Sequence, residues 1–366
     1  MEVPEYLLPE SSIAQVPLEP RDSARLLDAL DPGGALDDRH VRDLPSLVGA
    51  GDVVVVNNSR VLPARLRLRR PGGADAEVLL LAPEPGDART WSALVRPGRK
   101  LAPGCLLGVP AVPAVPAAPA APTGPAQRDG DGDGDHNNQG EATEAVVEVG
   151  ERLDGGRRRV RLLDDPAAIF ERCGEMALPP YIKARLADPE RYQTVYATLP
   201  GSVAAPTAGL HLTRDVLDGI VAQGASLRTV DLAVGLGTFR PVRVAHAEDH
   251  DMHSERYSVP EETWQACLDA RKSGGRVLAV GTTTVRALES TAASGKLAGE
   301  SGLFIRPGFD WSVTDVLLTN FHQPRSTLLV LMEAFMGPRW RDVYGEALRR
   351  GYRFLSFGDA MITAHR

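Results

Sequence analysis

The chain has 366 residues, of which 43% are hydrophobic and 24% charged, so it is long enough for two domains and ordinary in composition for a soluble globular enzyme. Its formal net charge of −7 argues against a nonspecific nucleic-acid binder, although a basic face can lie on an acidic body. The sequence has no basic and apolar leader, no run of ~18 apolar residues and no C-x-x-C pair among its three cysteines, so we expect a cytoplasmic protein without disulfides that does not associate with membranes.

Short strand-like segments fill much of the N-terminal half. They are rich in apolar residues and are bounded by Gly, Pro or Asp. Closely spaced short strands predict a small β-barrel or sandwich. From Leu101 to about Glu148, Pro/Ala repeats and an Asp/Gly-rich run contain too few large apolar residues to fold, so we expect a disordered surface loop at 101–148. The strand-like segments are residues 51–70, 76–83, 90–101 and 144–163.

From Pro166 onward, helical segments alternate with buried strands. This pattern predicts an α/β fold with a mixed or largely parallel sheet and flanking helices. The segments expected as strands are 226–239, 276–284 and 316–324, and those expected as helices are 263–275, the run starting at 285, and 326–337.

Residues 191–212 carry one formal charge but many hydroxyl and aromatic side chains. A core element would show an apolar period, and a linker would lack the aromatic residues. Glycine and proline in this segment allow tight turns and close backbone approach. We therefore interpret it as a loop that lines a ligand site. Its candidate contact residues are Tyr192, Gln193, Thr207, Gly209 and His211.

Basic residues are frequent in the strand-like segments. Arg65, Arg67 and Arg69 alternate with leucines, so on a strand their guanidinium groups share one face. Across residues 60–100, nine Lys/Arg stand against four Asp/Glu. Such a face can simply be solvated, or it can hold a phosphate backbone.

A histidine cluster lies within residues 246–255. His246, His250 and His253 have a spacing that would converge on a metal ion in a helix, but the segment lacks helix-favouring residues and an H-E-x-x-H motif. A polar surface loop and a metal site both remain open. General acid/base chemistry by one of these histidines with Glu255 needs no metal, and we favour it.

Polar residues also follow several expected strands. Thr282 and Thr283 precede a helix, where hydroxyls and free backbone N–H groups suit a carboxylate or phosphate, although simple capping is the alternative. Asn320, His322 and Asp359 also follow strand-like or glycine-ended segments, and ligand groups gather at strand ends in α/β folds.

Two glycines, Gly235 and Gly237, follow the strand that begins near residue 226. They do not make a dinucleotide fingerprint, because Arg240 stands where G-x-G-x-x-G requires its third glycine. The chain also lacks a G-x-S-x-G elbow, which argues against a serine hydrolase.

Taken together, these segments resemble the S-adenosylmethionine:tRNA ribosyltransferase-isomerase family of the queuosine pathway, and the likeness runs nearly end to end outside 101–148. The resemblance implies an α/β domain at 1–64 and 166–366 with a small β-barrel inserted at 65–165. It also implies transfer and isomerisation of the ribosyl group of S-adenosylmethionine onto 7-aminomethyl-7-deazaguanine in tRNA, giving epoxyqueuosine, adenine and methionine. The segments that carry the likeness are 13–27, 51–66, 178–182, 191–212, 234–242, 250–257, 276–290, 317–329 and 352–361.

The implied reaction suggests roles for the candidate residues. The sulfonium acidifies the neighbouring 5′ carbon, so a positioned base can remove a proton there, and adenine needs a proton donor as it leaves. We expect His253 with Glu255 to act as the base, and His211 or His322 to act as the acid. No metal or redox cofactor is required, and we expect a monomer.

The remaining candidates bind substrate. The nucleoside pocket is expected to contain small residues, which let the backbone approach a flat ligand: Thr207, Gly209, Gly235, Gly237 and Thr238. Thr282 and Thr283 could hold the methionine carboxylate. Further substrate contacts are assigned to Tyr192, Gln193, Arg240, Asn320 and Asp359, and contacts to tRNA phosphates to Arg60, Arg65, Arg67 and Arg96.

The sequence departs from the family pattern at two places. The family reads N-D-T-R where this chain has residues 57–60, NNSR, and H-H-M-H-S-E where it has residues 250–255, HDMHSE. The first change removes a carboxylate and the second a histidine, so a paralogue with another deazaguanine acceptor is an alternative. A metal-dependent hydrolase built on His246, His250 and His253 is a second alternative, and a noncatalytic RNA-binding module is a third.

Overall fold

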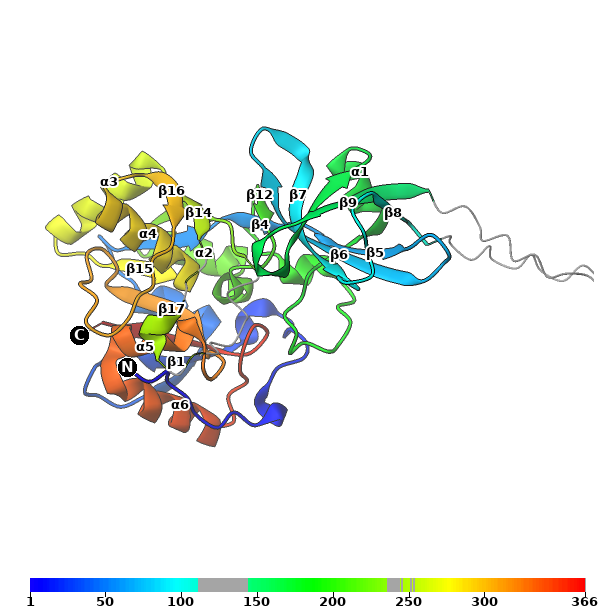
Figure 1. The fold of residues 1–366 in the computed structure, drawn as a ribbon. Coiled ribbons are helices and arrows are strands. Elements are labelled where there is room, and N and C mark those ends of the chain that lie inside the picture. The colour runs from blue at the N-terminus through cyan, green and yellow to red at the C-terminus, as the bar shows by residue number, and fades with distance from the viewer. Residues whose placement is uncertain (111–143, 236–243, 245, 251, 253, 366) are drawn as a thin grey trace, which may run out of the picture. The chain divides into compact units, whose positions relative to one another are not determined.

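The computed structural model describes residues 1–110, 144–235, 244, 246–250, 252 and 254–365. The chain folds as two units (Figure 1). The larger unit comprises Met1–Leu62 and Met176–Arg366, and the smaller unit, Pro63–Glu175, is inserted between these two segments in the sequence.

A mixed nine-stranded sheet forms the centre of the larger unit. The four strands β13, β3, β15 and β17 run parallel to one another, and β1 and β18 form a further parallel pair. The pairs β13–β14, β14–β16, β17–β18 and β1–β2 are antiparallel. The predicted α/β fold with a mixed sheet is confirmed. In order across the sheet, the strands are β16 (Ala298–Ser301), β14 (Glu255–Ser258), β13 (Ser226–Leu232), β3 (Val53–Asn57), β15 (Val277–Val280), β17 (Val316–Asn320), β18 (Ala360–Ala364), β1 (Arg25–Ala29) and β2 (Asp37–His40).

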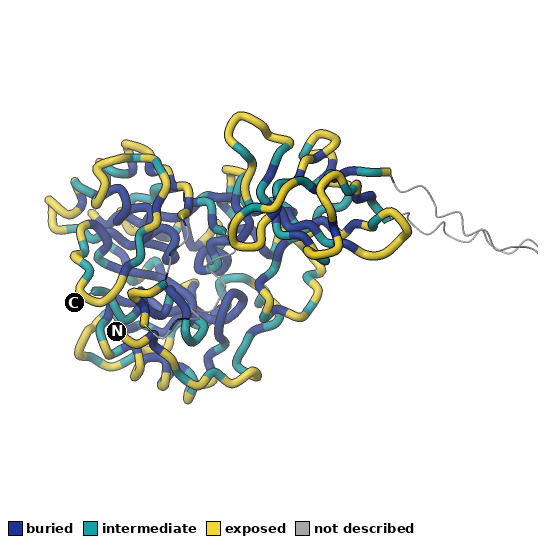
Figure 2. Tube along the Cα trace, in the orientation of Figure 1, coloured by how far each residue is buried: buried dark blue, intermediate teal, exposed yellow. Residues whose placement is uncertain are grey.

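The central strands are buried on both faces (Figure 2). Strand β3 shows why, since successive side chains of a strand point to opposite faces. Val54 and Val56 join one apolar cluster, and Val53 and Val55 join another. A continuous valine run is therefore the expected sequence of a strand that is covered by helices on both sides.

Helices cover the two faces of this sheet unequally. Helix α2 packs with β3 and β15 in the first cluster, whereas α3 and α4 pack on the opposite face of β3. Helices α5 and α6 pack on that opposite face at β15, β17 and β18. Within the described residues, no helix combines the length and apolarity needed to cross a bilayer. The helices of this unit are α2 (Arg214–Ala222), α3 (Glu261–Lys272), α4 (Thr282–Ser294), α5 (Thr327–Met336) and α6 (Trp340–Arg349).

Short elements connect the larger unit. Strand β4 (Ser59–Val61) pairs in parallel with β12 (Leu199–Ser202) in a separate two-stranded sheet. Short 3₁₀ helices lie in several of the remaining connections. They are η1 (Glu10–Ser12), η2 (Arg21–Ser23), η3 (Val41–Leu47), η5 (Pro189–Tyr192), η6 (Thr207–His211), η8 (Ala247–Asp249) and η9 (Gly337–Arg339).

The smaller unit is a closed antiparallel barrel, as the spacing of short strands predicts. Six strands follow one another around it, and the pair Arg69–Gly108 closes the ring between β5 and β8. Leu66 and Leu68 are buried inside, while Arg67 and Arg69 are exposed, which confirms the predicted alternation. Around the barrel lie β5 (Arg65–Arg69), β6 (Asp75–Glu84), β7 (Asp87–Arg96), β10 (Arg158–Leu162), β9 (Ala145–Arg152) and β8 (Cys105–Gly108), with β11 (Gly174–Glu175), η4 (Asp154–Gly156) and α1 (Pro166–Cys173) in the same unit.

The interpretation of 101–148 as a disordered loop is wrong at both ends of that range. Strand β8 and the start of β9 belong to the barrel, where Leu107 pairs with Val147 and both side chains are fully buried. The Pro/Ala composition hid β8, because this strand contributes only a few apolar residues. The start of β9 matches the strand-like segment 144–163, which overlaps the end of the predicted loop. Residues 111–143 lie outside the described part of the chain.

Candidate functional site

Polar residues gather where the parallel strands of the large sheet end. Because β13, β3, β15 and β17 are parallel, their carboxyl ends meet at one edge. Asn57 ends β3, Asn320 ends β17, and Gly281 follows β15. Ligands of α/β proteins bind at such an edge. We therefore take the carboxyl edge of these four strands as the candidate site.

Helix α4 begins at this edge. Gly281 precedes it with a φ of +87°, a conformation that favours glycine. Thr282, Thr283 and Thr284 form the first helical turn, whereas the sequence analysis expected them to precede the helix. The hydroxyl of Thr284 donates to the carbonyl of Val280 (2.7 Å). Since Gly281 has no capping side chain, the first N–H groups of the helix can serve an anionic ligand.

Asn57 connects β3, β13 and α4. Its Oδ1 accepts hydrogen bonds from the backbone N–H groups of Ser59 (3.1 Å) and Leu232 (3.2 Å). Its Nδ2 donates to the carbonyl of Leu232 (3.0 Å) and to the hydroxyl of Thr283 (3.3 Å). The side chain is fully buried. Asn57 thus fixes the position of Thr283, a role that the sequence analysis did not foresee.

A second cluster joins η6 to the end of β17. The hydroxyl of Thr207 donates to Oδ1 of Asn320 (2.8 Å), and Nδ2 of Asn320 lies 2.9 Å from Nε2 of His211. The same Nδ2 donates to the carbonyl of Asp359 (3.3 Å). The structure therefore brings together four residues that the sequence analysis selected from three distant segments.

His211 is uncharged in this cluster. Its pKa is lowered to about 4 by burial first, and then by the positive charges of Arg353, Arg191 and Arg21. An amide nitrogen can only donate, so Nε2 of His211 accepts from Asn320 and the ring carries its proton on Nδ1. A neutral imidazole is a poor proton donor, so the geometry does not favour His211 as the general acid.

His322 lines a pocket at the same edge. Burial lowers its pKa to about 3, and its Nε2 lies 3.1 Å from the hydroxyl of Thr319. The pocket is also lined by Asn320, Ser326 and Leu355. Leu355 has a φ of +68°, a strained conformation for a branched residue that is often found at ligand sites. His322, like His211, is therefore neutral and unsuited to donate a proton at neutral pH.

Glu255 forms a buried ion pair with Arg286 of α4. Both side chains are about 95% buried, and Oε1 of Glu255 also accepts the backbone N–H of Gly235 (3.0 Å). Arg286 in turn donates to the carbonyls of Ser301 (3.2 Å) and Leu303 (3.3 Å). Burial lowers the pKa of Arg286 to about 10, which leaves it charged. Arg286 is not among the predicted site residues, although it is the one charged residue within the first two turns of its helix.

Several candidates cannot be placed. Gly237, Thr238, Arg240 and His253 lie outside the described residues. Of the other cluster histidines, His250 contacts the ring of Phe304 edge-on, with ring centres 5.7 Å apart. Among the described side chains, no group of three His, Cys, Asp or Glu is arranged to hold a metal ion. Because His253 is not described, this finding does not test the metal site that the histidine spacing suggests.

Other candidates in the site hold the fold. Both amide atoms of Gln193 are engaged by the backbone of Val61, at 3.0 Å and 2.8 Å. Tyr192 is fully buried against Phe357, with ring centres 6.0 Å apart. Asp359 accepts the backbone N–H groups of Arg25 (3.0 Å) and Arg353 (2.7 Å). The polar atoms of Gln193 and the carboxylate of Asp359 are thus engaged by backbone groups, and the ring of Tyr192 packs within the core.

Gly209 is needed for close packing within η6. A side chain at this position would collide with the hydroxyl of Tyr196. The glycine therefore permits the η6 turn that brings Thr207 and His211 to Asn320. The expected contact of Gly209 with a nucleoside stays a prediction.

The predicted tRNA-binding arginines differ in their surroundings. Arg67 forms an ion pair with Glu175 (2.7 Å), which raises the pKa of the guanidinium, and Arg60 of the larger unit pairs with Glu190 (2.5 Å). Arg65 is half-buried on the barrel. Arg96 is exposed and makes no side-chain hydrogen bond or ion pair with the described residues. Arg96 is therefore the freest of the four for an external phosphate.

Comparison with known proteins gives consistent matches over nearly the whole chain. A family model described as "Queuosine biosynthesis protein" matches residues 2–363. A protein of Rubrobacter xylanophilus named S-adenosylmethionine:tRNA ribosyltransferase-isomerase is 46% identical over 359 residues, which cover 98% of this chain and 96% of the relative. A protein of Thermus thermophilus with the same name is 45% identical, with 99% of each chain covered.

A solved structure also matches the full length. The crystal structure of an S-adenosylmethionine tRNA ribosyltransferase from Thermotoga maritima has 31% sequence identity and a TM-score of 0.52 to this chain. The match covers 98% of this chain and 99% of the Thermotoga chain.

Proposed function

Because the chain belongs to the queuosine biosynthesis protein family, we propose that it transfers and isomerises the ribosyl group of S-adenosylmethionine onto 7-aminomethyl-7-deazaguanine in tRNA. The products are epoxyqueuosine in tRNA, adenine and methionine. The enzyme is a transferase–isomerase that acts as a cytoplasmic monomer without a metal or redox cofactor. The names of the relatives support the two substrates, S-adenosylmethionine and tRNA.

The observation that carries this proposal is the group of neutral hydrogen-bonding side chains at the strand edge. His211 and His322 are neutral, and Asn320 and Thr207 present amide and hydroxyl groups beside them. A nucleoside offers matching donors and acceptors. Neutral side chains around the sulfonium of the substrate also leave its positive charge uncompensated. This positive charge increases the acidity of the neighbouring carbon.

We assign proton removal at the 5′ carbon to His253, with Glu255 as its support. Glu255 is held by Arg286 and by the N–H of Gly235, so its charge is fixed and its oxygens are engaged. Glu255 anchors the start of β14, and His253 precedes it by two residues in the sequence.

Protonation of the departing adenine requires a revision of the expected roles. His211 and His322 have pKa values of about 4 and 3, so neither is an imidazolium at neutral pH. We therefore propose that both rings contact the nucleoside as neutral hydrogen-bonding groups, and that the proton comes from another group or from water.

The reaction can be tested directly. The purified protein is incubated with S-adenosylmethionine deuterated at the 5′ carbon and with tRNA that carries the aminomethyl deazaguanine. Mass spectrometry should show free adenine, a mass gain on the modified nucleoside, and loss of deuterium to solvent. Arg349→Gln, which changes an exposed side chain of α6, is a control that should retain activity. Full turnover with complete retention of deuterium would refute proton removal at this carbon.

A paralogue with another acceptor is the second candidate, and Asn58 favours it. Asn58 stands where the family pattern has Asp, and its Nδ2 lies 3.2 Å from the hydroxyl of Thr198. Its buried Oδ1 has no partner among the described residues. Turnover of a free deazaguanine base, but not of modified tRNA, would establish this alternative. An Asn58→Asp variant should then gain activity on modified tRNA.

A further inference from the structure

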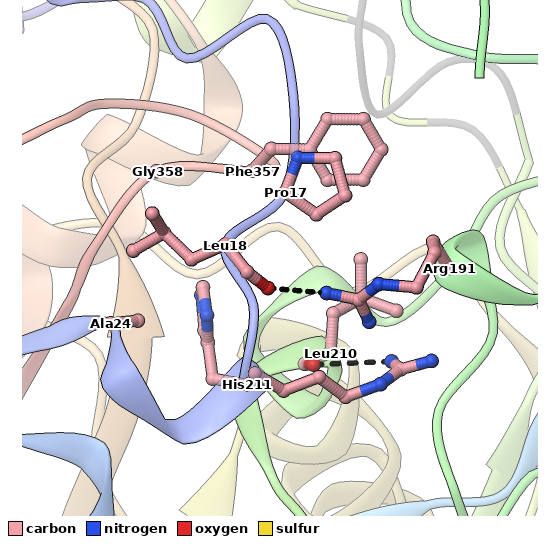
Figure 3. Close-up of a pocket in the computed structure, with 9 residues that line it drawn as sticks. Pro17, Leu18, Ala24, Arg191, Leu210, His211, Phe357 and Gly358 are labelled. Atoms are coloured by element: carbon pink, nitrogen blue, oxygen red, sulfur yellow. Dashed lines mark hydrogen bonds between the residues drawn. The ribbon is translucent and has the colours of Figure 1, made fainter. Parts of the chain in front are cut away.

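A small pocket lies on the side of His211 that faces the N-terminal segment (Figure 3). Its walls include Leu18, Arg21, Arg191 and Phe357, all within the larger unit. The enclosed volume is about 10 Å³, which is space for one water-sized group. His211 lines this pocket and also contacts Asn320 at the strand edge, so an occupant of the pocket lies beside the candidate site.

Arg191 has unused hydrogen-bonding capacity in this pocket. Its Nη2 donates to the carbonyl of Leu18 (2.6 Å), as Figure 3 shows. Its Nη1 is buried and has no hydrogen-bond partner in the described part of the chain. Only 13% of the side chain is exposed, and its ion-pair partner Glu19 is 69% exposed. A buried donor without a partner is costly, so this group calls for an acceptor.

Two further guanidinium groups lie nearby and are bound to neutral partners. Arg21 donates to the carbonyls of Gln193 (2.7 Å) and Glu190 (2.9 Å). Arg353 donates to the carbonyl of Val16 (3.2 Å), and its buried Nε has no partner among the described residues. Carbonyl groups satisfy hydrogen bonds but do not neutralise charge, so the positive charge of both side chains persists.

The nearby carboxylates do not neutralise the positive charge of these three arginines. Glu190 pairs with Arg60 on the surface, and Glu19 is largely in water. The oxygens of Asp359 are bound by backbone N–H groups. In agreement, burial and the charge of Arg191 both lower the pKa of Arg21, and the carboxylates of Glu19, Asp188 and Glu190 offset this only in part.

We propose that Arg21 and Arg191 form an oxyanion site beside His211, with Arg353 adding positive charge nearby, and that this site binds one oxygen of a carboxylate or phosphate group of one of the two substrates. The side chains of Arg21 and Arg191 both line a cavity that admits one oxygen-sized group, and the buried, unpaired Nη1 of Arg191 is available there to donate to an anion. The source is either the methionine carboxylate of S-adenosylmethionine or a tRNA phosphate. The assignment of the oxyanion to one of these two substrates rests on the proposed function, whereas the oxyanion site itself does not.

Anion binding can be measured without the reaction. The thermal unfolding midpoint is compared in sodium sulfate and in sodium chloride at matched ionic strength. Sulfate should raise the midpoint of the wild type and of Arg349→Gln by several degrees, and it should have no specific effect on Arg191→Gln. Arg191→Lys keeps the charge and should retain part of the sulfate effect, which separates anion binding from a loss of folding. An equal sulfate effect in Arg191→Gln and the wild type would overturn the site.

Kinetics then identify the source. If the site holds the methionine carboxylate, Arg191→Gln should raise KM for S-adenosylmethionine by about tenfold or more, while binding of decarboxylated S-adenosylmethionine stays unchanged. If it holds a phosphate, KM for tRNA should rise instead, and the salt dependence of tRNA binding should become shallower by about one unit. Unchanged KM values for both substrates would overturn the assignment to a substrate. If the wild type binds sulfate but has no activity, the proposed function is refuted and the oxyanion site is not.

Discussion

Asn320 donates its side-chain amide to Nε2 of His211 across 2.9 Å, and the hydroxyl of Thr207 fixes the orientation of that amide at its other end. This chain of hydrogen bonds determines both the tautomer and the charge of a histidine that lies 109 residues away in sequence. Because burial also favours the neutral ring, protonation of His211 disrupts the cluster.

The first prediction concerns pH and stability. The pKa values of His211 and His322 fall from 6.5 in the unfolded chain to about 4 and about 3 in the folded one. Between those values the unfolded state binds more protons, so stability is complete above pH 6.5 and declines as the pH falls toward 4. From pH 7.5 to pH 5 we expect a loss of about 2 kcal/mol for each histidine, at 1.36 kcal/mol per pKa unit.

Urea unfolding followed by tryptophan fluorescence measures this loss. A Trp91→Phe background confines the signal to the larger unit, which contains Trp264, Trp311 and Trp340. His211→Gln should lose about half of the pH dependence. A free energy of unfolding that does not change between pH 7.5 and 5 would contradict the neutral assignment of both rings.

The second prediction concerns the buried pair of Arg286 and Glu255. Arg286→Met leaves a buried carboxylate without its countercharge and should cost about 3–5 kcal/mol in the free energy of unfolding. The double variant with Glu255→Gln removes that charge and should recover a large part of the loss, so the two effects are not additive. Equal destabilisation of the double and the single variant would show that the charge pair is not what holds β14 to α4.

The sequence predicts the framework of this protein better than its contacts. The valine run at 53–56 and the leucines at 66 and 68 specify strands, because burial imposes a period or a continuous apolar run. Strand β2 (Asp37–His40) has no such pattern, since it is an edge strand of exposed and half-exposed polar residues. It forms because β1 offers it a partner, and a local pattern cannot reveal that partner.

The residues that the sequence predicts for the candidate site also fall into two groups. Thr207, His211 and Asn320 were selected because polar residues among turns or at strand ends are conspicuous, and the fold brings them together. Gln193 and Asp359 were selected by the same signal, yet they bind backbone groups. A buried polar side chain that binds backbone and one that faces a ligand look alike in sequence. Only the position of the hydrogen-bond partner separates them.

The third prediction tests the structural role of Gln193. Gln193→Ala removes two hydrogen bonds to Val61 and leaves buried backbone groups of β4 unpaired, so it should cost about 2–3 kcal/mol in stability. Gln193→Glu can still accept from Val61 N but cannot donate to its carbonyl, and it should cost a similar amount at neutral pH. At a temperature where the variants are folded, KM for S-adenosylmethionine should stay within about twofold of the wild type. A tenfold rise in KM with unchanged stability would restore Gln193 as a substrate contact.

The fourth prediction compares two exposed arginines of the barrel. Strand pairing places Arg67 opposite Glu77, and Glu77 opposite Arg96 on the next strand. Arg67 is already paired with Glu175, whereas Arg96 has no side-chain partner in the described residues. To bind a phosphate, Arg67 must give up its carboxylate, and Arg96 need not. Arg96→Ala should therefore weaken tRNA binding more than Arg67→Ala does.

Filter binding of tRNA at several salt concentrations distinguishes these variants. Arg96→Ala should lower the affinity several-fold and make the slope of log K against log salt shallower by about one unit. Arg67→Ala should change the slope less, and neither variant should alter binding of S-adenosylmethionine. Glu175→Gln frees Arg67 and should raise tRNA affinity if the barrel face meets the phosphate backbone. Equal slopes in all three variants and the wild type would place the tRNA contacts on another surface.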